Sequence, residues 1–191
     1  MRSMNRQDGV WPSGSLTVHS GETCRVDLGK GELCMNRPSW DEYFTTIAFD
    51  VAKRSNCIRR RVGAVIVKEH NIISTGYNGT PVGVRNCFEG GCPRCASDVP
   101  SGQSTDTCIC VHAEENAICF AARHGARTEG AVLYCTTRPC FGCLKESVQA
   151  GLTRITYVEP YDYEQELEDI YWQLATESGI KLDRLEVEIP G

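Results

Sequence analysis

The pattern of apolar and polar residues changes character near residue 36. Residues 1–36 are rich in Gly, Ser and charged side chains and show no apolar periodicity, so we expect a flexible tail outside the fold. Ser39 and Glu42 then form a capping-box pattern, S-x-x-E, ahead of apolar residues at helical spacing, which predicts a first helix. The residues expected on its buried face are Tyr43, Ile47 and Val51, with Phe44 and Ala48 as further candidates.

Two apolar, β-branched runs follow this helix, at residues 62–67 and 72–77. The polar residues Glu69, His70 and Asn71 separate them, so the pattern predicts a β-hairpin. Both runs are almost continuously apolar rather than alternating, which is typical of a sheet covered on both faces.

Helical and strand patterns alternate in the C-terminal part of the chain. We expect, in order, a helix opened by His112 and ending near Gly125, a strand at 131–136, a helix from Cys140 with Pro139 in its first turn, a strand at 154–158, a helix at 164–178 and a last strand at 185–189. This alternation predicts one three-layer α/β/α domain over residues 37–191, with helices on both sides of a mixed sheet of about five strands.

Residues 78–111 interrupt this pattern, because frequent Gly and Pro residues break any regular element. So long an insertion loop needs a stabilising feature. Its five cysteines suggest a structural metal, which can cross-link a segment that has too few apolar residues for a core. These cysteines are Cys87, Cys92, Cys95, Cys108 and Cys110.

Composition narrows the class of protein. A chain of 191 residues with 41% hydrophobic content suits one domain with a sizeable core. A net charge of -5 leaves no broad basic face for a phosphate backbone, so we expect a small-molecule substrate and no polymeric nucleic acid. The chain has twelve cysteines but shows no secretion-signal pattern and no apolar run long enough for a bilayer. We therefore expect a cytoplasmic protein without membrane association, whose cysteines bind metal or are buried as thiols.

The strongest chemical signal is an H-x-E motif followed by P-C-x-x-C. His112, Cys140 and Cys143 supply three zinc ligands, and a catalytic zinc takes three protein ligands and keeps one position open. Glu114 is left free as the catalytic proton carrier. Each motif alone is weak, since C-x-x-C is often a redox or structural pair, but together they are the signature of zinc deaminases that act on nucleobases. Both ligand sets stand at expected helix N-termini, where the helix dipole favours the thiolate.

These motifs, with the segments at 62–67 and 76–81, resemble the deoxycytidylate (dCMP) deaminase family of the cytidine deaminase superfamily over residues 39–178. The segment G-Y-N-G-T-P at 76–81 is the more discriminating signal, because the zinc motifs specify only deamination. The resemblance implies a cytidine-deaminase-like fold and zinc-dependent conversion of dCMP to dUMP and ammonia in pyrimidine deoxynucleotide metabolism.

The resemblance also implies roles for individual residues. Asn78 would hydrogen-bond the deoxyribose, the backbone of Ala113 would face the pyrimidine ring, and Tyr161 would close over the nucleotide. Arg59 would meet the substrate phosphate, although an arginine there equally fits a solvated surface. Arg123 falls where related phage enzymes place an allosteric or subunit-contact arginine. The family further implies a homo-hexamer regulated by deoxynucleoside triphosphates.

The cysteine-rich loop resembles branches of the family that carry a second, structural zinc. The matching positions are Cys57, Cys87, Cys92 and Cys108, with Cys95 and Cys110 as substitutes. Three other functions stay open: deamination of dCTP or a modified dCMP, deamination of tRNA adenosine, and non-catalytic zinc binding in an interaction protein. The acidic composition and the G-Y-N-G motif speak against tRNA, and the free Glu114 speaks against a purely binding role.

Overall fold

The computed structural model describes residues 23–27, 32–100 and 102–186. The chain divides into two compact units, residues 1–39 and 40–191. In the first unit, strands β1 (Thr23–Asp27) and β2 (Glu32–Asn36) pair antiparallel, with Cys24 opposite Met35. The sequence analysis expected a flexible tail in this region and did not predict the hairpin.

A five-stranded mixed sheet forms the centre of the second unit, in the order β4-β3-β5-β6-β7. Its strands are β3 (Gly63–Lys68), β4 (Asn71–Tyr77), β5 (Val132–Thr137), β6 (Arg154–Glu159) and β7 (Lys181–Arg184). The β3 strand pairs antiparallel with β4 and β5, whereas β5, β6 and β7 run parallel. The predicted mixed sheet is confirmed.

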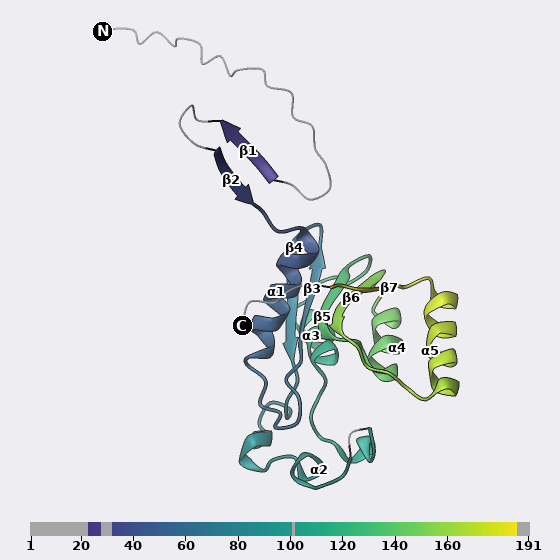
Figure 1. The fold of residues 1–191 in the computed structure, drawn as a ribbon. Helices are drawn as coiled ribbons and strands as arrows, with labels where there is room; N and C mark the ends of the chain where they lie inside the picture. The colour runs from purple at the N-terminus through teal and green to yellow at the C-terminus, as the bar shows by residue number, and fades with distance from the viewer. Residues whose placement is uncertain (1–22, 28–31, 101, 187–191) are drawn as a thin grey trace. The chain divides into compact units, whose positions relative to one another are not determined.

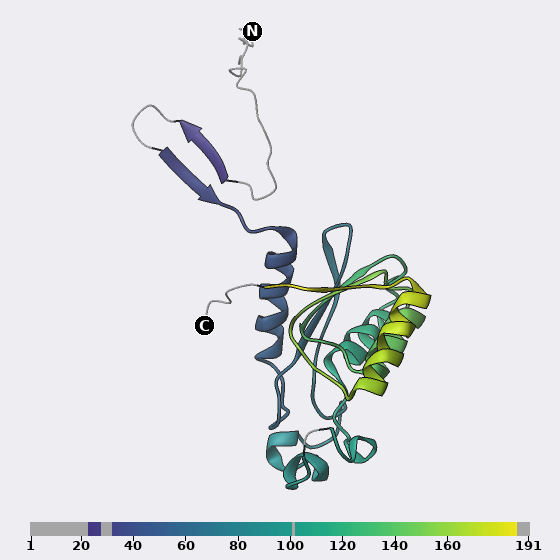
Figure 2. The same cartoon turned by 45° about the vertical axis from the view of Figure 1, so that its right-hand side comes forward.

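Helices cover both faces of this sheet. The four long helices of the second unit are α1 (Trp40–Ala52), α3 (Ala113–Arg123), α4 (Phe141–Gln149) and α5 (Gln165–Ser178). Helix α1 packs on one face, and α3, α4 and α5 lie on the other (Figures 1 and 2). The three-layer α/β/α prediction is confirmed. Within the described residues, no helix is both long and apolar enough to cross a membrane.

Two separate cores explain the nearly continuous apolar runs of the sequence. In β3, Ala64 and Ile66 belong to the core beneath α3, α4 and α5. Their neighbours Val65 and Val67 belong to the core beneath α1, together with Phe44. Because successive strand residues face opposite sides, a sheet covered twice must be apolar at every position.

The buried face of α1 differs from the expected one. Phe44 and Ala48 are fully buried, whereas Tyr43 is 45% exposed. A Cβ added at Gly63 would lie 2.0 Å from the carbonyl oxygen of Ala48 and 2.5 Å from the backbone nitrogen of Ala52. The helix therefore turns its small residues toward the sheet, and this close approach sets its rotation.

The hairpin between β3 and β4 is confirmed, with a turn one residue shorter than expected. Glu69 and His70 both have left-handed backbones, with φ of 50° and 61°, the conformation of a two-residue hairpin turn. Asn71 already belongs to β4.

The last strand lies earlier in the chain than predicted. Strand β7 ends at Arg184, so Leu185 and Glu186 lie outside it, and residues 187–191 lie outside the described part of the chain. Gly179 ends α5 with φ of 72°, and the chain enters the sheet directly, with Ile180 buried.

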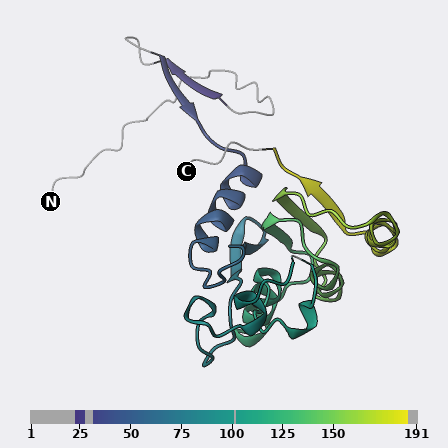
Figure 3. The same cartoon turned by 60° about the horizontal axis from the view of Figure 1, so that its bottom comes forward.

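Residues between β4 and α3 form the insertion loop at the lower end of the domain in Figure 1. Three short helical turns interrupt it: η1 (Cys87–Glu89), α2 (Pro93–Ala96) and η2 (Thr105–Thr107). Figure 3 brings this end forward. At the end of the loop, Gly79 and Val111 exchange two backbone hydrogen bonds, so the chain re-enters the domain beside the end of β4.

Candidate metal centre

Two helix N-termini bring together the three predicted zinc ligands. His112 is the N-cap of α3, Cys140 is the N-cap of α4, and Cys143 lies in the first turn of α4. The Nδ1 atom of His112 is 3.3 Å from the Cys140 sulfur and 3.4 Å from the Cys143 sulfur. Pro139 precedes the N-cap, so it stands just outside the helix and not in its first turn as predicted.

The geometry and chemistry of these donors fit a zinc ion. All three donor atoms lie within 4.8 Å of one another. A tetrahedral zinc with ordinary Zn–N and Zn–S bond lengths places its nitrogen and sulfur ligands about 3.5 Å apart. One imidazole and two thiols form a soft donor set that suits zinc, and three ligands leave the fourth position for a reacting water.

The three ligands also shift one another's protonation. Hydrogen bonding to Cys143, opposed by burial and helped by His112, lowers the pKa of Cys140 to about 4. Hydrogen bonding to Cys140 raises the pKa of His112 to about 9, against the effect of burial. The protein's own groups therefore favour a thiolate beside a protonated imidazole. Metal binding must displace the imidazole proton, so it releases protons.

Glu114 is the fourth residue of the site. It does not belong to the group of three donor atoms that could hold the metal. It lies in the first turn of α3 with 4% of its surface exposed. Burial raises the pKa of Glu114 to about 7. The Cys135 thiol of β5 approaches the same carboxylate and is itself fully buried. A buried carboxyl whose pKa is near neutrality can both accept and donate a proton.

Contacts that the sequence analysis missed hold the first turn of α3. The Glu115 carboxylate accepts a 2.7 Å hydrogen bond from the His112 backbone N–H. This contact is half of a capping box with histidine at the N-cap. An acidic residue three positions after His112 is the sequence signal that could have predicted it. The Asn116 amide donates a 2.8 Å hydrogen bond to the Tyr77 carbonyl and ties the same turn to the end of β4.

Two tyrosines fix the P-C-x-x-C segment. The backbone N–H of Phe141 donates to the Tyr163 hydroxyl oxygen at 2.7 Å. The fully buried Tyr171 hydroxyl donates to the Pro139 carbonyl at 3.0 Å. Both tyrosines follow β6 in the chain, at positions where the sequence shows only an ordinary amphipathic pattern. Their role was therefore not predictable from spacing.

A buried arginine joins the same segment to α5. Arg138 is 5% exposed, and its guanidinium lies 4.0 Å from the ring centre of Tyr171. It pairs with Glu168 at 2.7 Å and donates to the Tyr161 carbonyl at 2.9 Å. The Tyr161 ring, expected to close over the nucleotide, stands edge-on to the Tyr163 ring at 5.0 Å.

Asn78, the expected sugar contact, has an internal role in this structure. Its side-chain oxygen accepts hydrogen bonds from the Val62 N–H at 2.8 Å and the Ser55 hydroxyl at 2.7 Å. Its amide donates to the Arg60 carbonyl at 2.8 Å. Asn78 therefore fixes the loop before β3, one residue ahead of the Gly79–Val111 pairing that leads to the metal centre.

The remaining predicted contacts lie in two different environments. Ala113 is fully buried at the start of α3, where its carbonyl packs against Gly76 of β4. Arg123 is exposed in the last turn of the same helix.

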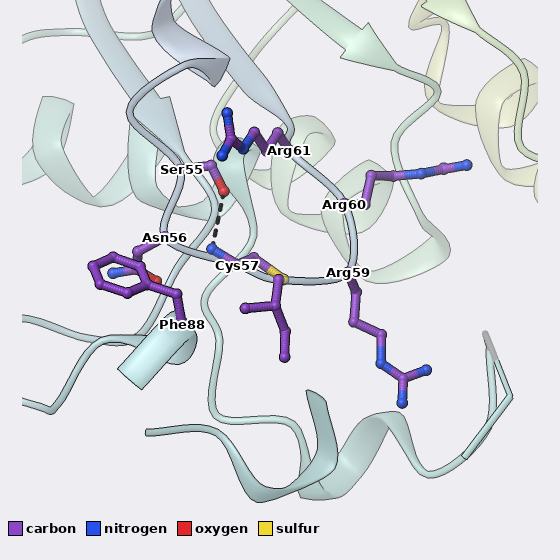
Figure 4. A pocket seen from close by; sticks show the side chains of 8 residues that line it. Ser55, Asn56, Cys57, Arg59, Arg60, Arg61 and Phe88 are labelled. Atoms are coloured by element: carbon purple, nitrogen blue, oxygen red, sulfur yellow. Dashed lines mark hydrogen bonds between the residues drawn. The ribbon is translucent and has the colours of Figure 1, made fainter. Parts of the chain in front are cut away.

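The structure gives Arg59 a role that the sequence did not suggest. Its guanidinium donates to four backbone carbonyls of the insertion loop, those of Arg94, Cys95, Ser97 and Val99. The predicted phosphate contact is therefore not available to this side chain as it stands. Arg59 and the other residues of the segment 55–61, together with Phe88, line a pocket of about 500 Å³. Figure 4 shows Arg59, Arg60 and Arg61 pointing in three different directions around it.

The four expected ligands of a second metal do not share one site. Cys57 and Cys87 fall in one set of four thiols, and Cys92 and Cys108 fall in another. The separation follows from the loop path: the Phe88 N–H bonds to the Asn56 carbonyl and places η1 beside the Cys57 segment. The substitutes Cys95 and Cys110 complete both sets.

Comparison with known proteins places the chain in a family. Residues 38–159 match the family described as the cytidine and deoxycytidylate deaminase zinc-binding region. The deoxycytidylate deaminase of Schizosaccharomyces pombe is 51% identical over 126 residues, 66% of this chain and 39% of the relative. That of Saccharomyces cerevisiae is 48% identical over 130 residues, 68% of this chain and 41% of the relative. The chain thus spans about two fifths of the length of both.

Shorter relatives match along nearly their whole length. The deoxycytidylate deaminase of Mycobacterium phage D29 is 42% identical over 128 residues, 64% of this chain and 97% of the relative. The crystal structure of the cyanophage S-TIM5 dCMP deaminase with dCMP and dUMP is 30% identical, with a TM-score of 0.61 over 78% of this chain and 98% of that one. The match over residues 38–159 includes every residue of the candidate metal centre, and the chain belongs to the cytidine and deoxycytidylate deaminase family.

Proposed function

We propose that this chain catalyses the zinc-dependent hydrolytic deamination of dCMP to dUMP and ammonia. The observation that carries the proposal is the combination of three zinc ligands with one buried carboxylate that is not among them. His112, Cys140 and Cys143 converge from two helix N-termini, and Glu114 is 4% exposed beside them. A structural zinc site has four ligands and needs no such carboxylate.

Each residue has a defined part in the reaction. His112, Cys140 and Cys143 would hold the zinc ion, which supplies Lewis-acid activation of a water molecule. The Glu114 carboxylate takes one proton from that water and delivers it to the ring nitrogen of the cytosine. Once the water oxygen is bonded to C4, the carboxylate carries the second proton from that hydroxyl to the amino group. The C4–N bond then breaks, so that water and dCMP become dUMP and ammonia. Burial shields the carboxylate from bulk water, which keeps this proton within the site.

The relatives support dCMP as the substrate. Three of them are named deoxycytidylate deaminase, and the cyanophage enzyme was solved with dCMP and dUMP. We assign the deoxyribose contact to the Asn78 amide, the ring contact to the Ala113 backbone and the covering aromatic to Tyr161. Among the described residues, the Arg60 carbonyl uses one of the two Asn78 amide hydrogens, which supports a sugar contact through the other.

The same proposal covers the domain that carries catalysis, the compartment, the oligomeric state and the effectors. We assign catalysis to residues 37–191 and place the protein in the cytoplasm as a homo-oligomer, a hexamer in the family's pattern. Arg123 is exposed, which supports a role in subunit contact or in binding a deoxynucleoside triphosphate effector.

Replacement of the catalytic carboxylate tests the mechanism. Glu114→Gln keeps the size of the side chain but cannot carry the proton, so kcat for dCMP should fall by at least about 100-fold. Zinc content should stay equal to wild type, because Glu114 is not a ligand. Glu177→Gln, on the exposed side of α5, is the matched control and should keep full activity. A Glu114→Gln enzyme that keeps more than a tenth of wild-type kcat, or that loses zinc, would refute the assigned role.

A further inference from the structure

The only buried cluster that the structure places in the insertion region consists entirely of cysteines, within the part of the chain described. Four members are buried and two are half-buried, and no aliphatic or aromatic side chain belongs to the cluster. We call these residues the six-thiol cluster: Cys57, Cys87, Cys92, Cys95, Cys108 and Cys110. Six sulfurs replace the apolar core that a loop of this length would otherwise need.

The six-thiol cluster resolves into two overlapping sets of four. The first set is Cys57, Cys87, Cys95 and Cys110, and the second set is Cys92, Cys95, Cys108 and Cys110. Within each set, all four sulfurs lie within 4.8 Å of one another. Cys95 and Cys110 are common to both sets, and each set has two thiols of its own.

The sulfur separations match the edge of a metal–thiolate tetrahedron. Cys95 lies 4.0 Å from Cys57, 3.8 Å from Cys108 and 4.0 Å from Cys110, and Cys92 lies 3.8 Å from Cys108. With a Zn–S bond of about 2.3 Å, the tetrahedral edge is about 3.8 Å. A disulfide bond is only about 2.05 Å long. Cys95 has three sulfur neighbours at 3.8–4.0 Å, so the distances favour no single disulfide pair.

We propose that the six-thiol cluster binds two zinc ions, with Cys95 and Cys110 bridging them. One ion alone would use four thiols and leave two others without a ligand role. Two ions that share two thiolates give each ion four sulfur ligands and use all six. Such closed tetrahedral sites have no open position, so this centre is structural.

The cluster also joins distant parts of the chain. Cys57 precedes β3, η1 and α2 supply the middle of the cluster, and Cys110 stands two residues before His112. The Arg59 guanidinium strengthens this junction through its bonds to the carbonyls of residues 94–99. A dinuclear centre would therefore fix the segment that leads into the catalytic ligand, whatever substrate the enzyme uses.

Metal counting on the intact chain tests the proposal. Residues 1–191 are purified under reducing conditions with zinc, and native mass spectrometry and elemental analysis give the metals per chain. We expect three zinc ions in wild type, two in the cluster and one at the catalytic centre. The paired variant Cys92→Ser/Cys108→Ser removes only the thiols exclusive to the second set and should hold two. Cys119→Ser, exposed and outside both sets, should keep three.

X-ray absorption on wild type gives a second readout that needs no variant. Two tetrahedra that share an edge place their metals about 3 Å apart, so we expect a zinc–zinc scattering path. Two zinc ions per chain without that path would overturn the proposal. So would disulfides among the six cysteines, or iron with acid-labile sulfide. Glu114→Gln should leave the count at three, so failure of the cluster and failure of the deaminase assignment are distinguishable.

Discussion

Gly76 is the position where a single added methyl group should push the sheet away from α3, the helix that carries the proposed catalytic residue Glu114. A Cβ at Gly76 would lie 2.1 Å from the Ala113 carbonyl oxygen and 2.4 Å from the Ala117 backbone nitrogen. Both atoms belong to the backbone of α3, so no side chain can rotate away. Since van der Waals contact begins near 3.5 Å, α3 must retreat by about 1 Å or more. Helix α3 begins directly after His112 and carries Glu114 in its first turn.

The expected cost has two parts. Overpacking of this kind lowers the free energy of unfolding by about 1–3 kcal/mol, and the rigid backbone places Gly76→Ala at the upper end. A displacement of about 1 Å in catalytic groups lowers the rate by about 100-fold. We therefore expect Gly76→Ala to lose about 3 kcal/mol in urea unfolding and about 100-fold in kcat/KM for dCMP, measured well below its unfolding midpoint.

Two other glycines provide matched controls. A Cβ at Gly63 would clash as closely with α1, on the opposite face of the sheet, so Gly63→Ala should lose similar stability with a smaller loss of kcat/KM. A Cβ at Gly130 meets nothing within 4 Å, but φ is 76°, so Gly130→Ala should lose about 1 kcal/mol of stability and no activity. The reasoning is refuted if Gly76→Ala stays within about 0.5 kcal/mol of wild type with unchanged kcat/KM.

Two further predictions concern polar contacts around the domain. Tyr171→Phe leaves the Pro139 carbonyl without its buried donor, so urea unfolding should show a loss of about 1–2 kcal/mol, and an unchanged midpoint would contradict this. Partial burial alone would raise the pKa of Asp41, but hydrogen bonds from Arg154 and Tyr134 outweigh it and lower that pKa. The carboxylate therefore stabilises the fold above its ordinary pKa of about 3.9, and this contribution is lost as the pH falls through the lower folded value. Asp41→Asn should accordingly be less stable than wild type at neutral pH, with a difference that shrinks in denaturation curves below about pH 4; a constant difference would contradict the assignment.

Local signals in the sequence were sufficient to predict which residues the candidate metal centre brings together. The H-x-E and P-C-x-x-C motifs each place their ligands at the start of a helix, and His112, Cys140 and Cys143 meet as the spacing predicts. The order of strands and helices was equally readable, because each element carries its own apolar period. Within residues 40–186 only the last strand was misplaced, where Gly179 ends α5 and the chain enters the sheet without a loop; the β1–β2 hairpin before them was not predicted.

Features that depend on how separate segments meet were not predictable. The rotation of α1 follows from the close approach at Gly63, which no periodicity within the helix records. The sequence predicted that the loop cysteines bind metal, but it could not divide them into two sets. That division depends on the path of residues 78–111 in space. The resemblance implies a phosphate contact for Arg59, whereas its partners in the structure are backbone carbonyls 36 and 40 residues away in the chain.

Product analysis over a panel of cytosine compounds tests the central claim most directly. The wild-type chain is given dCMP, deoxycytidine, CMP and dCTP in turn, and ammonia and the deaminated product are measured in the same reactions. The account predicts dUMP and ammonia in equal amounts from dCMP, with a higher kcat/KM than for deoxycytidine, because the relatives that support the assignment are named for the deoxynucleotide. Equal use of deoxycytidine, or clearly better use of dCTP, would contradict the substrate assignment, and no ammonia from any of the four would contradict the deaminase itself.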